Sequence, residues 1–193
     1  IAPLDKMPCW IEGDLWSVYP CIQSESPPQD AWCKVQSLNA LLYNLFDVEP
    51  TLNPASVVSS NSIDLLTQLD PLRKMIDLCD QGVSLSHTLM CHRDLRVDNV
   101  MWHNGMPHAI DFEYYGMRPY VVDQCALSLD WSQPWPVFED MRQLKQAQGA
   151  LLSEWLHWFE SLFYVAEQDK GLARYAHRQW SQTRAVLPKF SVG

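Results

Sequence analysis

Two short stretches hold the residues of this chain that are best suited to chemistry. The first runs from Asp94 to Asn99 and the second from Ile110 to Glu113. Both offer carboxylate and amide oxygens, the ligands that Mg²⁺ prefers, and Mg²⁺ in proteins often accompanies phosphate groups. Asp94 adds a carboxylate that could orient or deprotonate a hydroxyl group. These residue types indicate transfer of a phosphoryl group to a hydroxyl, assisted by a metal ion near Asp111.

An Asn-Gly pair between the two stretches predicts how they meet in space. Asn104-Gly105 lies between apolar residues and is the strongest short-range signal for a hairpin with a two-residue turn. The predicted register sets His103 opposite Met106, Trp102 opposite Pro107, Met101 opposite His108, Val100 opposite Ala109 and Asn99 opposite Ile110. Asn99 then lies beside Asp111, and cross-strand neighbours and their diagonals are roughly 5–8 Å apart. The amide and carboxylate oxygens can therefore share one hard cation.

The loop that carries Asp94 follows an expected strand over residues 86–91 and has to turn before the hairpin begins. In protein kinases the sequence H-R-D-L-x-x-x-N supplies a base and a Mg²⁺ ligand, and the Asp of a following D-F motif holds Mg²⁺. His92-Arg93-Asp94-Leu95, Asn99 and Asp111-Phe112 match each specified position. The pattern predicts a phosphotransferase in which Asp94 faces the acceptor hydroxyl.

Two departures from protein kinases narrow this prediction. Glu113 stands where protein kinases have the glycine of D-F-G, and only eleven residues separate Asp111 from Asp123, too few for a long activation segment. The chain instead resembles the kinase-like small-molecule phosphotransferases, the group of choline/ethanolamine kinases and aminoglycoside phosphotransferases. Choline and ethanolamine kinases carry an I-D-F-E-Y motif, then an Asp, and then an acidic residue followed by Trp. The matching residues here are Ile110 to Tyr114, Asp123 and Asp130-Trp131.

This resemblance implies ATP and Mg²⁺ as cofactors and a small-molecule acceptor as substrate. The catalytic residues that it implies are Asp94, Asn99 and Asp111, and the Mg²⁺ ligands are Asn99, Asp111 and Glu113. The nucleotide would contact Met101 and Ile110, the hinge residues Tyr19, Cys21 and Ile22, and, at the γ-phosphate, Arg96. Asp130 and Trp131, with Trp135 or Trp158, would receive an ammonium group over aromatic faces. His92 and Asp123 would hold the catalytic loop by hydrogen bonds.

Each of these residues also has a purely structural explanation. Asp94, Asn99 and Asp111 could be turn and cap residues, and Glu113 could cap the turn that follows it. Arg96 could be a solvated surface charge. A zinc site is not expected, because the histidines lack the spacing of structural or hydrolytic zinc sites. Three matches in one frame favour the phosphotransferase interpretation.

The predicted architecture is α+β, a protein-kinase-like fold with a mainly helical C-terminal lobe and a short antiparallel hairpin at the catalytic site. Residues 1–22 are interpreted as a remnant of the N-terminal lobe, with its last hairpin and the hinge, and residues 23–193 as the helical catalytic lobe. Helices are expected from the N-cap Asp30 to Leu45, over residues 63–79 with a break near Pro71, and over residues 123–131, 141–166 and 172–186. In the first helix, Val35, Leu38, Leu41 and Leu42 are spaced for one buried face.

Composition limits the partners. Acidic residues outnumber basic ones by 23 to 14, and the net charge of −9 argues against a nucleic acid partner. The 6 cysteines form no C-x-x-C pair and no secretory leader precedes them, which favours reduced thiols and a cytoplasmic location. The apolar runs are too short to span a bilayer. The oligomeric state does not follow from the sequence.

The leading hypothesis is ATP- and Mg²⁺-dependent transfer of the γ-phosphate to a hydroxyl of a small, amine-bearing molecule similar to choline, ethanolamine or an aminoglycoside. The alternative is a non-catalytic nucleotide-binding or scaffold module. That alternative is supported by the N-terminal residues, which contain neither a glycine-rich phosphate loop nor a lysine in a V-A-I-K context. The presence of Asp94, Asn99 and Asp111 together favours the enzyme.

Overall fold

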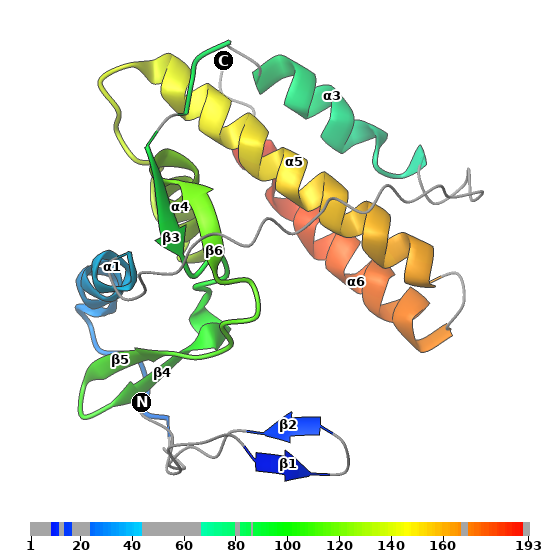
Figure 1. The fold of residues 1–193 in the computed structure, drawn as a ribbon. Helices are drawn as coiled ribbons and strands as arrows, with labels where there is room; N and C mark the ends of the chain where they lie inside the picture. The colour runs from blue at the N-terminus through cyan, green and yellow to red at the C-terminus, as the bar shows by residue number, and fades with distance from the viewer. Residues whose placement is uncertain are drawn as a thin grey trace. The chain divides into compact units, whose positions relative to one another are not determined.

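The computed structural model describes residues 9–11, 14–16, 24–43, 67–79, 82–85, 87–166 and 170–190 (Figure 1). The chain divides into two compact units, one of residues 1–47 and 90–116 and the other of residues 48–89 and 117–193. The expected boundary after residue 22 lies outside the described residues. The motif residues Asp94, Asn99 and Asp111 all belong to the first unit.

The first unit contains two antiparallel hairpins. β1 (Cys9–Ile11) pairs with β2 (Asp14–Trp16), where the sequence predicts a hairpin. β4 (Val100–His103) pairs with β5 (Met106–Ala109), and every partner in this ladder is the predicted one. The turn residues Asn104 and Gly105 have φ values of 51° and 67°, the left-handed conformation that a two-residue hairpin turn requires. The hairpin prediction and its register are confirmed.

Pro107 lies within β5 although proline cannot donate a backbone hydrogen bond. The backbone N–H of its partner Trp102 donates to Ser24 Oγ, and the Trp102 carbonyl accepts from the Glu25 N–H. These groups therefore point away from β5, and Trp102 and Pro107 form a non-hydrogen-bonded pair. At such a position the missing N–H of proline costs nothing.

α1 (Ala31–Leu42) covers the hairpin by packing against β5. Its buried residues are Val35, Asn39 and Leu42, spaced by about one and two helical turns. The prediction for Leu41 is wrong: its side chain is 66% exposed, because it lies about 100° around the helix from Leu42. Leu45 lies outside the described residues.

The predicted N-cap of α1 is confirmed in position but not in its hydrogen bond. Asp30 occupies the N-cap position, but its φ and ψ of −93° and 20° are not those of a typical cap, and its side chain makes no capping hydrogen bond. The carboxylate pairs instead with Lys34 at 3.2 Å. Asp30 thus forms an ion pair with Lys34, four residues later, instead of accepting hydrogen bonds from the backbone N–H groups of the first helical turn.

The second unit is built around α5 (Met141–Ala166), which has the predicted bounds. It packs against α3 (Asp70–Cys79), α4 (Tyr120–Asp130) and α6 (Lys170–Val186), and Figure 1 shows α3 and α6 running alongside it. η2 (Leu187–Phe190) follows α6. The buried core is continuous across these helices and includes Leu72, Val122, Leu144, Leu151, Leu152, Phe159, Phe163, Trp180 and Phe190. The mainly helical character of this part of the chain is as predicted.

Several bounds after residue 66 differ from expectation. α4 begins at Tyr120 rather than Asp123, and α6 begins at Lys170 rather than Leu172. The strand β6 (Gly116–Pro119), which the sequence did not predict, directly precedes α4 and pairs with β3 (Thr88–Cys91), the strand expected over residues 86–91. The helix expected over residues 63–79, with a break near Pro71, is described from residue 67 onward; α3 begins at Asp70, so Pro71 lies in its first turn, where no intrahelical N–H bond is required. No helix in the described ranges is long and apolar enough to cross a membrane.

Candidate active site

The backbone is strained immediately before one motif aspartate and at the other. Arg93, which precedes Asp94, has a φ of 68°, and Asp111 itself has a φ of 63°. Residues other than glycine rarely adopt this left-handed conformation, which costs about 1–3 kcal/mol and tends to occur where function requires it. Strain next to Asp94 and at Asp111 is therefore an independent sign of a functional site.

Asn99 connects the loop to the hairpin. Its Nδ2 donates to the Asp94 carbonyl at 2.8 Å and to the Asp94 carboxylate at 2.7 Å. Two oxygen acceptors on one side fix the orientation of the amide. Asn99 is buried at the end of η1 (Val97–Asn99), and its Oδ1 is the atom left for another ligand. An amide oxygen is a donor that suits Mg²⁺.

The Asp94 carboxylate has two partners on the loop. Besides the hydrogen bond from Asn99, it forms an ion pair with Arg96, with 2.9 Å between Arg96 Nε and the carboxylate oxygen. Burial raises the pKa of Asp94, and the nearby charge of Asp111 adds to this, although Arg96, the Asn99 hydrogen bond and His92 oppose it. A carboxylate with a raised pKa binds a proton more readily than an ordinary aspartate, which suits a group that receives a proton from a hydroxyl.

His92 holds the loop against the strand end that carries Asp111. The imidazole is fully buried, and its Nε2 donates to the Ile110 carbonyl at 3.0 Å. The ring also packs against Phe112, with 4.6 Å between centroids. Ile110 in turn donates its N–H to the Asn99 carbonyl at 3.0 Å. The loop and the hairpin base thus form one hydrogen-bonded unit, and this geometry fits the bracing role expected of His92.

The two faces of the β4–β5 hairpin differ. Val100 and Trp102 are buried, whereas Met101 on the opposite face is only partly buried. Because side chains alternate along a strand and cross-strand partners share a face, His108 lies on the Met101 side, and Ile110, two residues after His108, is also partly buried. Asn99 precedes β4 in η1 and is buried. Adenine binding against Met101 and Ile110 stays a prediction.

The structure says less about the remaining expected ligands of the metal ion and the nucleotide. Glu113 is exposed in the turn that follows Asp111. Within the described residues no cluster of three or more His, Cys, Asp or Glu side chains could hold a metal ion. The expected Mg²⁺ set contains only two such residues, because its third member is the Asn99 amide. Tyr19, Cys21 and Ile22 lie outside the described residues.

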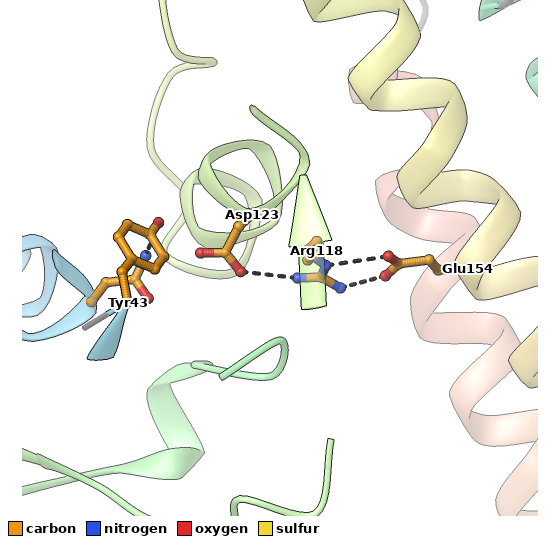
Figure 2. A network of polar contacts seen from close by, with 5 residues as sticks. Tyr43, Arg118, Asp123 and Glu154 are labelled. Atoms are coloured by element: carbon orange, nitrogen blue, oxygen red, sulfur yellow. Dashed lines mark hydrogen bonds and ion pairs between the residues drawn. The ribbon is translucent and has the colours of Figure 1, made fainter. Parts of the chain in front are cut away.

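In the second unit, Asp123 belongs to a buried ionic network that the sequence did not predict (Figure 2). Arg118 in β6 bonds to Asp123 in α4 at 3.3 Å and to Glu154 in α5 through two of its nitrogens. Burial opposes the charge of Arg118, but Glu154 and Asp123 outweigh it and hold its pKa above the usual arginine value. The network joins three elements of this unit.

Asp130 and Trp131 lie at the C-terminal end of α4. The N–H groups of Trp131, Ser132 and Gln133 bond back to α4 carbonyls, with Ser132 at a φ of 52°, so the helix ends in a Schellman-type turn. The negative end of the helix dipole reinforces the charge of Asp130 and favours a cation there. The rings of Trp135 and Trp158 pack on core phenylalanines, with centroid distances of 5.1 and 4.8 Å.

Comparison with known families decides the class of this protein. The family model of the phosphotransferase enzyme family, APH, matches residues 25–183, which is most of the chain. The chain belongs to the phosphotransferase enzyme family. The match includes Asp94, Asn99 and Asp111 as well as the second unit's Asp130. No curated protein and no solved structure matches this phosphotransferase significantly.

Membership confirms the kinase-like phosphotransferase interpretation at the level of the family and supports a small-molecule substrate. The mixed fold, mostly helical with small antiparallel sheets, agrees with it. Besides β6, two sets of side-chain contacts in this phosphotransferase were not predicted from the sequence: the Arg118 network and the contacts of Glu25 with the hairpin turn. The partners of Arg118 lie 5 and 36 residues away, and Glu25 reaches residues 79 and 80 positions later, so no local spacing signals either contact.

Proposed function

We propose that this phosphotransferase transfers the γ-phosphate of ATP, with Mg²⁺, to a hydroxyl of a small, amine-bearing molecule. The observation that carries the proposal is the double hydrogen bond from Asn99 to Asp94 at the base of a hairpin whose other strand leads into Asp111. The candidate base Asp94 and the candidate metal ligands Asn99 and Asp111 thus belong to one loop and one hairpin. Positioning and charge neutralisation are the main sources of rate enhancement in phosphoryl transfer.

Asn99 through Oδ1, the Asp111 carboxylate and Glu113 would hold the metal. When bound, Mg²⁺ supplies positive charge that neutralises the phosphate oxygens. Asn99 contributes in a second way, because its Nδ2 keeps the Asp94 carboxylate at the loop–hairpin junction. The left-handed backbone of Asp111 sets the direction in which its side chain leaves the strand end.

Asp94 would orient the acceptor hydroxyl and take its proton. In the structure this carboxylate is paired with Arg96, whose side chain is 48% exposed. An incoming hydroxyl competes with that pair, and a released Arg96 has the charge and length to contact the γ-phosphate. The adenine would lie on Met101 and Ile110 and meet the backbone of Tyr19, Cys21 and Ile22. A cytoplasmic location remains a prediction from the cysteine pattern.

Asp130 and Trp131 would bind the ammonium group of the acceptor. Two features support them: the negative end of α4, and a tryptophan that follows Asp130 in the sequence, since aromatic faces attract cations. The Asp130 carboxylate also favours an amine-bearing acceptor, because a neutral alcohol gains no electrostatic attraction from it.

Replacing Asp130 by asparagine is expected to raise KM for amine-bearing acceptors about tenfold or more, because a hydrogen bond to a charged group contributes roughly 1.5–3 kcal/mol. KM for an amine-free alcohol is expected to stay unchanged. Steady-state rates with matched acceptor pairs provide the measurement. Asp77→Asn, which changes an exposed carboxylate on α3, is the matched control. If Asp130→Asn and Asp77→Asn had equal KM values for every amine-bearing acceptor, Asp130 would not be part of the acceptor site.

The proposed function is tested by ADP release from ATP by the full-length protein, with a panel of choline-like, ethanolamine-like, aminoglycoside and sugar acceptors, with Mg²⁺ and with EDTA. Acceptor-dependent, Mg²⁺-dependent release is the expected result. Binding of Mg²⁺-ATP without release for any acceptor would favour the nucleotide-binding alternative.

A further inference from the structure

The segment just before α1 lies along the free edge of β4. The Glu25 N–H donates to the Trp102 carbonyl at 2.9 Å, and the Trp102 N–H donates to Ser24 Oγ at 3.3 Å. The backbone of this strand is therefore held on both edges, by β5 on one side and by Ser24-Glu25 on the other. An edge that would otherwise leave unpaired N–H and C=O groups is closed.

Two opposite charges, Glu25 from this segment and Lys34 from α1, hold the tip of this hairpin. The Glu25 carboxylate accepts from the backbone N–H groups of Asn104 at 3.1 Å and Gly105 at 3.3 Å. Lys34 Nζ donates to the Gly105 carbonyl at 3.0 Å and also pairs with Asp30. A two-residue turn usually leaves these groups to water, so this pattern is a specific attachment. We refer to Glu25 and Lys34 together as the turn clasp.

We propose that the turn clasp positions the catalytic hairpin for nucleotide binding, with Glu25 as its main positioning residue. This inference rests on the proposed function, in which the nucleotide lies on Met101. Met101 is the strand neighbour of Trp102, the residue whose backbone the segment holds. Glu25 serves both attachments, through its N–H at Trp102 and its carboxylate at the turn, so loss of the clasp is expected to shift the strand that carries Met101.

The reacting groups have separate supports. Asp94 is held by Asn99 and Arg96, and the approach to Asp111 is held by the His92 bond to Ile110. None of these bonds involves the turn clasp. Weakening the clasp is thus expected to affect nucleotide binding far more than the chemical step, a separation that a general loss of stability would not produce.

The charge state of the clasp follows from its geometry. The backbone N–H bonds of Asn104 and Gly105 lower the pKa of Glu25; burial opposes this, and the charge of His103 lowers the pKa by a smaller amount than either. Lys34 also contacts this turn, at the Gly105 carbonyl, and is itself paired with Asp30. A carboxyl with a lowered folded-state pKa stabilises the fold above its ordinary pKa of 4.5, and this is lost as pH falls through the lower value. At neutral pH the clasp is therefore closed.

The test is Glu25→Gln, which keeps the length of the side chain and removes its charge. KM for ATP is expected to rise about three- to tenfold with kcat within about twofold, because charge-assisted bonds to backbone amides are replaced by weaker neutral ones. Lys34→Met is expected to act in the same direction, and the double variant to show less than the product of the two effects, since both hold one turn. Glu139→Gln, an exposed acidic residue in the second unit, is the control.

Amide hydrogen exchange of the full-length protein gives a readout that does not depend on activity. Glu25→Gln is expected to speed exchange at Asn104 and Gly105 about tenfold, on the energy scale of a charged hydrogen bond, and to leave Ile110 unchanged. If Glu25→Gln left exchange at the turn unchanged, or lowered kcat with a constant KM for ATP, the proposed role of the turn clasp would be wrong. Absence of any phosphate transfer by the wild type, with the exchange effect present, would instead count against the proposed function.

Discussion

Replacing Asp94 by asparagine is expected to lower kcat about 10²- to 10⁴-fold, the range that general base catalysis contributes. The amide has the shape of the carboxylate and still offers an oxygen to Asn99 Nδ2, so the loop keeps its main hydrogen bond. It cannot take a proton from the acceptor and no longer pairs with Arg96 as an anion. KM for ATP is expected to change little, because Asp94 is not a nucleotide ligand.

The matched control is Asp98→Asn, the same chemical change at an exposed carboxylate of η1, one residue before Asn99. It is expected to keep nearly wild-type turnover. Initial-rate kinetics with saturating ATP and acceptor separate the two variants, and circular dichroism checks that both are folded. Near wild-type turnover in Asp94→Asn would refute the role of this residue.

Replacing Arg118 by methionine is expected to lower the free energy of unfolding by about 3–5 kcal/mol, the cost of removing one partner from a buried ion pair. The Arg118 and Asp123 side chains are only 5% and 6% exposed, so the change leaves a carboxylate buried without its cation. β6 also loses its bonds to Glu154 in α5. Methionine fills a similar volume, which limits any cavity.

Arg142→Met provides the comparison, because Arg142 is 67% exposed and pairs with Asp140 at the surface. Surface pairs of this kind contribute about 0–1 kcal/mol. Urea unfolding of both variants, followed by tryptophan fluorescence, measures the difference. Similar midpoints for Arg118→Met and Arg142→Met would show that the buried network does not stabilise the second unit.

The parts of the fold that could be predicted are those in which the information is local. Asn104-Gly105 determines a turn with two left-handed residues, and that turn alone sets the register that brings Asn99 next to Ile110. The apolar spacing of α5 is long and regular enough to define both of its ends. The motif residues come together for the same reason, since they lie within one loop and one hairpin.

The features that could not be predicted depend on partners distant in sequence. β6 is a four-residue strand that contains both glycine and proline, and its pairing with β3 has no periodic signal. From the sequence alone, the Arg118 side chain would be expected to be exposed. It is buried because its partners Asp123 and Glu154, in α4 and α5, lie beside it in the fold. Leu41 fits the helical period as well as Leu42 does, and only the position of the neighbouring hairpin decides which one is buried.

The central claim is that Asp94, Asn99 and Asp111 form a Mg²⁺-dependent site for phosphate transfer to a small acceptor. The most direct measurement is ³¹P NMR of the full-length protein with ATP, Mg²⁺ and the acceptor panel, for the wild type and for Asp111→Asn. With the wild type we expect a new phosphomonoester signal that grows in step with ADP, and with Asp111→Asn or with EDTA we expect none. An equal phosphomonoester yield from Asp111→Asn, or ATP conversion that does not need Mg²⁺, would contradict this account.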